Sequence, residues 1–170
     1  MVPIILDPQN VSFAVIGEGD AMARRVQLLK DGGAQDVVVL SAEEATSTSL
    51  ADRQVVFIAG LDEASSSKLA AIAKDVGALV NVEDVTEYCD FHMPATVRRG
   101  DLLLTVSTGG KSPGLARHLR QHLEGQFDEE WAAIVTDVAE ARQRWIGEGA
   151  DMKTVASKTA AMIDQNGYLA

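Results

Sequence analysis

The chain has 170 residues, of which 46% are hydrophobic and 24% charged, and its formal net charge is −10. These proportions are typical of a globular protein with one ordinary domain, or one small domain and an appendage, and they exclude general disorder. The acidic balance argues against a nucleic-acid surface, and no uncharged apolar run is long enough for a membrane span. The N-terminus lacks the features of a secretory signal, and Cys89 is the only cysteine. We therefore expect a cytoplasmic protein.

Short apolar runs alternate with helical stripes through the first eighty residues. We expect strands over residues 12–16, 37–40, 55–59 and 78–82. Apolar residues at i, i+4 and i+7 indicate a helix between the first two strands, and a second stripe over 69–76 indicates another before the fourth. Strands this apolar, separated by helices, predict a doubly wound α/β domain with a parallel sheet covered on both faces.

The pattern changes after residue 93. A strand over 102–106 is followed by Ser112-Pro113, which places a hydroxyl at a helix N-cap and proline at the first helical position. Further helices are expected from Asp128 to the glycines near 147 and over 153–165. We therefore expect a Rossmann-like domain over 1–93, a small α+β segment over 94–125 and a helical region over 126–170.

Gly17-x-Gly19 lies between the first predicted strand and helix. There the first glycine permits a tight turn, and the second lets the backbone approach a pyrophosphate seated on the helix N-terminus. The third position of the fingerprint holds Met22 instead of a small residue, and Asp20 adds a negative charge nearby. A turn needed only for packing is the alternative to a dinucleotide site.

The end of the second predicted strand bears on the choice of cofactor. The acidic residue expected there is missing, but Ser41 could hydrogen-bond a ribose hydroxyl. Glu43 and Glu44 would repel a 2′-phosphate, so NAD is favoured over NADP.

Two further features suggest ligand chemistry. Asp84 follows the fourth predicted strand, where a carboxylate can act as a general base, although a turn or capping aspartate is the alternative. Residues 98–120 hold five basic residues and one acidic residue, a net charge of +4. In this segment Lys111 and the hydroxyls of Ser107, Thr108 and Ser112 could bind ligand carboxylates, unless the segment is only a solvated basic face.

Three other candidate sites are not supported. His118 and His122 share a helix face, but spacing supplies no third ligand, so no metal site is predicted. Gly110-Lys111-Ser112 resembles the end of a P-loop, but Thr105 stands where the first glycine is required. Cys89 suits a small buried apolar position better than a nucleophile.

The chain resembles the precorrin-2 dehydrogenase family, the N-terminal module of sirohaem synthases, over roughly residues 8–125. The resemblance is carried by an ordered set of segments and by the Gly17-x-Gly19-Asp20 turn followed by Arg24-Arg25; the segments are 81–84, 89–95, 98–102 and 107–117. It implies a homodimer in which 94–125 serves dimerisation and tetrapyrrole binding, with the helical part following.

The resemblance also implies a reaction and a set of site residues. The reaction is the oxidation of precorrin-2 to sirohydrochlorin, with hydride passing to NAD⁺ and with Asp84 as the general base. Asp20, Ala21, Ser41 and Ala42 match cofactor-contacting positions of the family. With Gly17 and Gly19 of the glycine turn, and with Gly60, they make up the predicted cofactor site. Thr108 falls where many relatives carry serine at the tetrapyrrole site. With Ser107, Gly109, Lys111 and Ser112 it makes up the predicted substrate site.

The sequence departs from the family at two places. Met22 replaces the small third residue of the glycine fingerprint, and Gly60-Leu61 stands where the family usually has Thr-Asp. Two alternatives therefore stay open: a bifunctional dehydrogenase and Fe(II) chelatase, and a non-catalytic protein that binds NAD or a tetrapyrrole.

Overall fold

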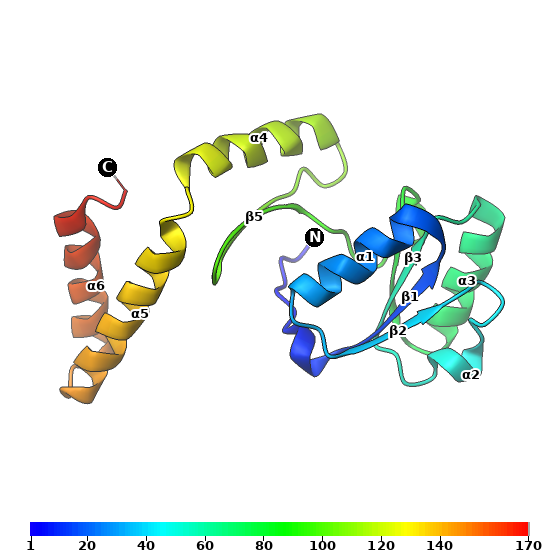
Figure 1. The fold of residues 1–170 in the computed structure, drawn as a ribbon, viewed down its shortest axis with the longest axis horizontal. Coiled ribbons are helices and arrows are strands. Elements are labelled where there is room, and N and C mark those ends of the chain that lie inside the picture. The colour runs from blue at the N-terminus through cyan, green and yellow to red at the C-terminus, as the bar shows by residue number, and fades with distance from the viewer. Residues whose placement is uncertain (170) are drawn as a thin grey trace. The chain divides into compact units, whose positions relative to one another are not determined.

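The computed structural model describes residues 1–169, which form two compact units that divide between Met93 and Pro94 (Figure 1). The first unit contains η1 (Pro8–Asn10), β1 (Ser12–Gly17), α1 (Gly19–Asp31), β2 (Asp36–Leu40), α2 (Ser47–Leu50), β3 (Val55–Ala59), α3 (Glu63–Asp75), β4 (Leu79–Val82) and η2 (Thr86–Tyr88). The second contains β5 (Ala95–Arg99), β6 (Leu102–Val106), α4 (Pro113–Gln126), α5 (Trp131–Gly147) and α6 (Met152–Asn166). No helix within residues 1–169 is long and apolar enough to cross a membrane.

The first unit is built on a four-stranded parallel sheet with the strand order β2-β1-β3-β4. In register, Ala14 of β1 lies opposite Val38 on one side and Val56 on the other, and Val56 lies opposite Val80. All five residues of β3 are buried, as expected of a central strand covered on both faces. The predicted α/β class is confirmed.

Side chains that alternate along the strands divide the core into two layers. One layer contains Ile16, Ile58 and Val80 with the buried face of α3, and the other contains Phe13 and Phe57 with α1. Because successive strand residues point to opposite faces, each central strand contributes to both layers. The two helices thereby cover opposite faces of one sheet.

One α-helix and one strand of the structure were not predicted, nor were the short 3-10 turns η1 and η2. α2 is a single helical turn held by a local capping box, in which the Thr46 and Ser49 side chains bond each other's backbone N–H groups. β5 pairs antiparallel with β6, with Val97 opposite Leu104, although Val97 is its only buried residue. Neither element carries the apolar periodicity from which the others were predicted.

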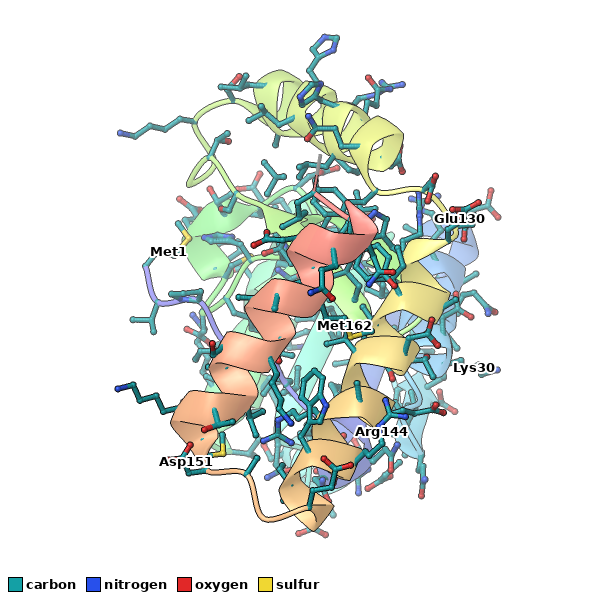
Figure 2. All side chains as sticks on the ribbon, turned by 90° about the vertical axis from the view of Figure 1, so that its left-hand side faces the viewer. Met1, Lys30, Glu130, Arg144, Asp151 and Met162 are labelled. Carbon is teal, nitrogen blue, oxygen red and sulfur yellow. The ribbon has the colours of Figure 1, made fainter. Side chains whose placement is uncertain are left out.

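The second unit has a thin core. α4 packs on the β5–β6 hairpin, and α5 and α6 lie side by side in opposite directions, as the positions of Glu130 and Asp151 show in Figure 2. Only three hydrophobic residues of this unit are buried among those described, namely Val97, Ala141 and Val155. The first unit buries eighteen, so the apolar residues of the second unit are mostly left at its surface.

Two turns at the carboxyl end of the sheet touch through their backbones. A Cβ on Gly17 would lie 1.7 Å from the Ala59 carbonyl oxygen, and a Cβ on Gly60 would lie 2.2 Å from the Glu18 carbonyl oxygen. The Glu18 N–H also donates a hydrogen bond to the Ala59 carbonyl at 3.3 Å. Neither glycine can carry a side chain without moving the backbone opposite it.

We expect Gly17→Ala to lower the free energy of unfolding by at least about 3 kcal/mol, because its methyl group would overlap backbone atoms. Gly77→Ala is the matched control, since Gly77 also has a positive φ, of +86°, but a Cβ there meets nothing within 4 Å. The control should cost only about 1–2 kcal/mol of backbone strain. Urea unfolding followed by circular dichroism compares the two, and equal losses would contradict the overlap.

Candidate functional site

The carboxyl edge of the parallel sheet gathers the predicted cofactor residues and the predicted base. Gly17 ends β1 and is followed by Gly19, Asp20 and Ala21; Ser41 and Ala42 follow β2, Gly60 follows β3, and Asp84 follows β4. Because the strands are parallel, their ends meet at one edge, which is where open α/β sheets bind ligands. The structure therefore brings these eight residues to one edge of the first unit.

The turn between β1 and α1 has the shape required to approach a phosphate. Gly19 has a φ of +65°, and a Cβ built on it meets nothing within 4 Å. Glu18 occupies the N-cap of α1 in an extended conformation and makes no side-chain capping bond. The first-turn N–H groups and the positive end of the helix dipole are thus open to an anion, which fits the pyrophosphate of a dinucleotide.

Met22 is accommodated in the core. Its side chain packs against the apolar layer between α1 and the sheet, which contains Phe13, Val15 and Phe57. The sequence rule treats a large residue at this position as a spacer that separates helix from strand. Here the side chain fills part of that layer, so Met22 is a packing residue beside the turn between β1 and α1.

The turn after β2 holds a carboxylate in place. The Ser41 N–H donates to Glu44 Oε2 at 2.8 Å, and the Glu44 N–H donates to Ser41 Oγ at 3.4 Å. The backbone hydrogen bond from Ser41, and then the bond from its side chain, lower the pKa of the Glu44 carboxyl. Sequence reasoning noted the charge of Glu44 but missed this bond, which a serine three residues before a glutamate could have suggested.

The backbone of Asp84 has a conformation that no other described non-glycine residue adopts. Asp84 is the one non-glycine position within residues 1–169 with a positive φ, of 61°. Its side chain is exposed, and its carboxylate makes no hydrogen bond or ion pair within the described part of the chain. Both oxygens of this carboxylate are therefore available to a ligand, at the edge where open α/β sheets bind them.

The predicted substrate residues lie together in the loop between β6 and α4 of the second unit. The Thr108 hydroxyl accepts from the Ser112 N–H and donates to the Ser112 carbonyl, each at 3.1 Å. Ser112 Oγ caps α4 by accepting from the Leu115 N–H, and Ser107 Oγ accepts from the Gly109 N–H. Lys111 is exposed, so its ammonium group is the part of this loop most available to an anion.

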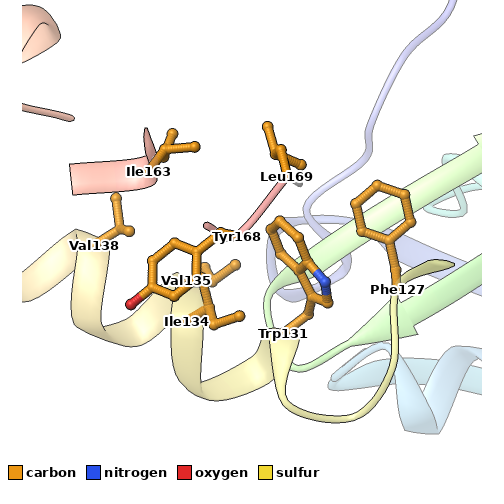
Figure 3. Close-up of a pocket in the computed structure, with 8 residues that line it drawn as sticks. All are labelled: Phe127, Trp131, Ile134, Val135, Val138, Ile163, Tyr168 and Leu169. Atoms are coloured by element: carbon orange, nitrogen blue, oxygen red, sulfur yellow. The ribbon is translucent and has the colours of Figure 1, made fainter. Parts of the chain in front are cut away.

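An apolar hollow of about 250 Å³ lies beside α5 (Figure 3). It is lined by Phe127, Trp131, Ile134, Val138, Ile163 and Tyr168, among others, and by no charged residue. The rings of Phe127 and Trp131 are 4.9 Å apart, and Arg99 Nε donates to the Phe127 carbonyl at 2.9 Å. Nothing in this lining would orient a charged substrate.

The described residues contain no group of three or more His, Cys, Asp and Glu side chains that could hold a metal ion.

Residues 4–95 match the family described as putative NAD(P)-binding, which covers more than half of the chain. The chain belongs to this family. Residues 99–126 match a second family, described as sirohaem biosynthesis protein central. Membership of an NAD(P)-binding family agrees with the open glycine turn at the start of α1.

Similar proteins extend the match along the chain. A siroheme synthase of Methylococcus capsulatus is 32% identical over 161 residues, covering 84% of this chain and 34% of the relative. A siroheme synthase of Nitrosococcus oceani is 30% identical with the same coverage. The chain thus spans about a third of the length of these curated relatives. The resemblance to sirohaem synthases noted in the sequence is confirmed.

A solved structure titled "SirC, precorrin-2 dehydrogenase" shares the fold. Its TM-score is 0.79 at 24% identity, and the match covers 100% of this chain and 93% of that chain. The helical C-terminal part is included in this match, which agrees with the predicted fold class.

We expect Gly19→Val to weaken NAD binding by at least about tenfold, because its side chain would occupy the open space that the pyrophosphate needs. Gly33→Val is the matched control, since Gly33 also has a positive φ, of +88°, and open space around it, but lies at the other end of α1. The control should bind NAD as the wild type does. Fluorescence titration measures both, and equal affinities would exclude this turn as the phosphate site.

Proposed function

We propose that the chain catalyses the NAD⁺-dependent oxidation of precorrin-2 to sirohydrochlorin, with Asp84 as the general base. The observation that carries this proposal is the unpartnered carboxylate of Asp84 at the same sheet edge as the glycine turn of an NAD(P)-binding family. The names of the relatives and of the structural neighbour support the substrate assignment.

The reaction removes two hydrogens from the substrate, one as a hydride and one as a proton. When bound, NAD⁺ supplies the hydride acceptor. The turn over Gly17 and Gly19 and the first turn of α1 would hold the pyrophosphate. The Asp84 carboxylate would take the proton, and its exposure leaves it accessible to a substrate that arrives from solvent.

The proposed substrate suits the basic segment of the second unit. Precorrin-2 carries eight carboxylates, and residues 98–120 have a net charge of +4 in a chain whose net charge is −10. Lys111 offers an exposed ammonium group for one of these carboxylates, with Gly109 beside it and the hydroxyls of Ser107, Thr108 and Ser112 in the same loop.

NAD is proposed over NADP because of the turn after β2. Hydrogen bonds from Ser41 lower the pKa of Glu44, so its carboxylate stays ionised where a ribose would lie. A 2′-phosphate would meet this negative charge, whereas a ribose hydroxyl could bond it. A cytoplasmic location, in which the thiol of Cys89 stays reduced, completes the proposal.

We further propose a homodimer formed through the second unit. Its three buried hydrophobic residues are few for a stable unit, and Leu115, Leu119, Ile146 and Met152 are each more than a third exposed. Light scattering coupled to size exclusion should give twice the chain mass of 18.1 kDa. A mass of one chain at micromolar concentration would contradict the dimer.

Anaerobic incubation with enzymatically made precorrin-2 tests the proposed activity. Sirohydrochlorin, followed by absorbance, should form with NAD⁺ and not without it. No product from a protein that binds NAD would contradict the dehydrogenase and favour the non-catalytic binding protein.

We expect Asp84→Asn to lower the rate of sirohydrochlorin formation by about 100-fold or more, the usual contribution of a general base. Asparagine keeps the side-chain size and tolerates a positive φ, so the turn should survive. The NAD dissociation constant should change by less than about twofold, since the phosphate turn is untouched. An unchanged rate would remove Asp84 from the mechanism.

A further inference from the structure

Glu83, the residue before Asp84, is tied to the helix that begins at the phosphate turn. Its Oε1 atom lies 3.5 Å from Arg24 Nη2 and 3.9 Å from Arg25 Nη2, and both arginines belong to α1. The side chains of Glu83 and Arg25 are only 21% and 23% exposed. The Glu83 N–H donates to the Ile58 carbonyl at 2.9 Å, which continues the pairing of β4 with β3.

The chain after Asp84 is fastened independently. Cys89 Sγ accepts from the Val82 N–H at 3.2 Å and lies 3.3 Å from the Val85 carbonyl oxygen. Asp90 accepts from the Val80 N–H at 3.0 Å and pairs with Lys74 Nζ at 3.1 Å. These bonds hold residues 85–90 against β4, so Glu83 is the nearest fixed point on the other side of Asp84.

Asp84 itself contributes nothing to its own placement. Its carboxylate has no partner within the described residues, and its positive φ is a sparsely populated conformation, although aspartate adopts it more readily than most non-glycine residues. A free carboxylate in a strained turn will therefore move unless both flanks are held. On the N-terminal flank, the side-chain anchor that adjoins Asp84 is the Glu83 carboxylate, and the next is Asn81, whose Nδ2 donates to the Phe91 carbonyl at 2.9 Å.

We propose that Glu83 is a positioning residue, which through Arg24 and Arg25 fixes the Asp84 turn relative to the helix that receives the cofactor. The proposed phosphate turn leads into α1, and α1 also carries the two arginines. The positions of the proposed base and of the cofactor are therefore both set by this one helix. The effect on turnover rests on the proposed function. The effect on the turn does not, since it needs only the ion pairs.

Ion pairs that solvent still reaches contribute little to stability as a rule; here Arg24 is 67% exposed, and the distances of 3.5 and 3.9 Å are those of a loose pair. We therefore expect Glu83 to affect the position of Asp84 and not the melting temperature of the protein. A displacement of about 1 Å can lower the rate by up to 100-fold. This separates a positioning role from a merely structural one.

Glu83→Gln tests the proposal, with Glu87→Gln as the matched control. Glu87 lies in η2, four residues after Glu83, is exposed and makes no hydrogen bond or ion pair within residues 1–169. Glu83→Gln should lower kcat by about tenfold, while KM, the NAD dissociation constant and the melting temperature stay close to those of the wild type. Hydrogen exchange over residues 82–86 should be about fivefold faster. Glu87→Gln should match the wild type throughout.

A double-mutant cycle with Arg25→Gln completes the test. Glu83→Gln and Arg25→Gln both remove the ion pair between Glu83 and Arg25. The double variant should therefore lose no more activity than Glu83→Gln alone. Additive losses would overturn the proposal, as would a kcat for Glu83→Gln equal to that of the control, or a loss that follows a lowered melting temperature.

The exchange measurement distinguishes the two proposals. If the wild type forms no sirohydrochlorin but exchange quickens in Glu83→Gln and not in Glu87→Gln, the dehydrogenase fails and the anchoring of the turn stands. If the wild type is active and exchange is equal in the two variants, the anchoring fails and the dehydrogenase stands.

Discussion

The architecture of the first unit depends on the backbone contact between the turns that follow β1 and β3. Gly17 faces the Ala59 carbonyl and Gly60 faces the Glu18 carbonyl, at separations that exclude any side chain. This contact fixes where α1 begins and the direction in which it leaves the sheet. The open N-terminus of α1 and the arginines that reach Glu83 are placed as a result. Gly60, which departs from the usual Thr-Asp of the resembled family, is thus required by packing in this chain.

The sequence predicted the sheet because each of its four strands is a short apolar run bounded by glycine or polar residues. It did not predict α2, whose four residues depend on reciprocal bonds between Thr46 and Ser49 and carry no apolar stripe. It did not predict β5 either, since a strand with one buried valine among threonine and arginines has no clear alternation. Such elements are formed by local hydrogen bonds or by pairing with a neighbouring strand, and the apolar pattern of the sequence indicates neither of these.

The candidate site was predictable where its chemistry is local. The glycine turn and the aspartate after β4 follow from strand ends in a parallel sheet. Met22 was judged by a rule about size, whereas its fit depends on the aromatic side chains of Phe13 and Phe57 beneath it. The pairing of Arg24 with Glu83 joins residues 59 positions apart, so it could not be predicted from the spacing of residues in the sequence.

The bonds around Cys89 give the chain a native reporter. It is the only thiol in the sequence, and its sulfur is enclosed by the backbone of Val82 and Val85, on either side of the proposed base. Cys89 is only partly buried, so the rate at which an alkylating reagent labels its sulfur reflects both that exposure and the breaking of these bonds. The labelling rate of the unmodified protein therefore responds to movement of the segment that carries Asp84, with no engineered probe.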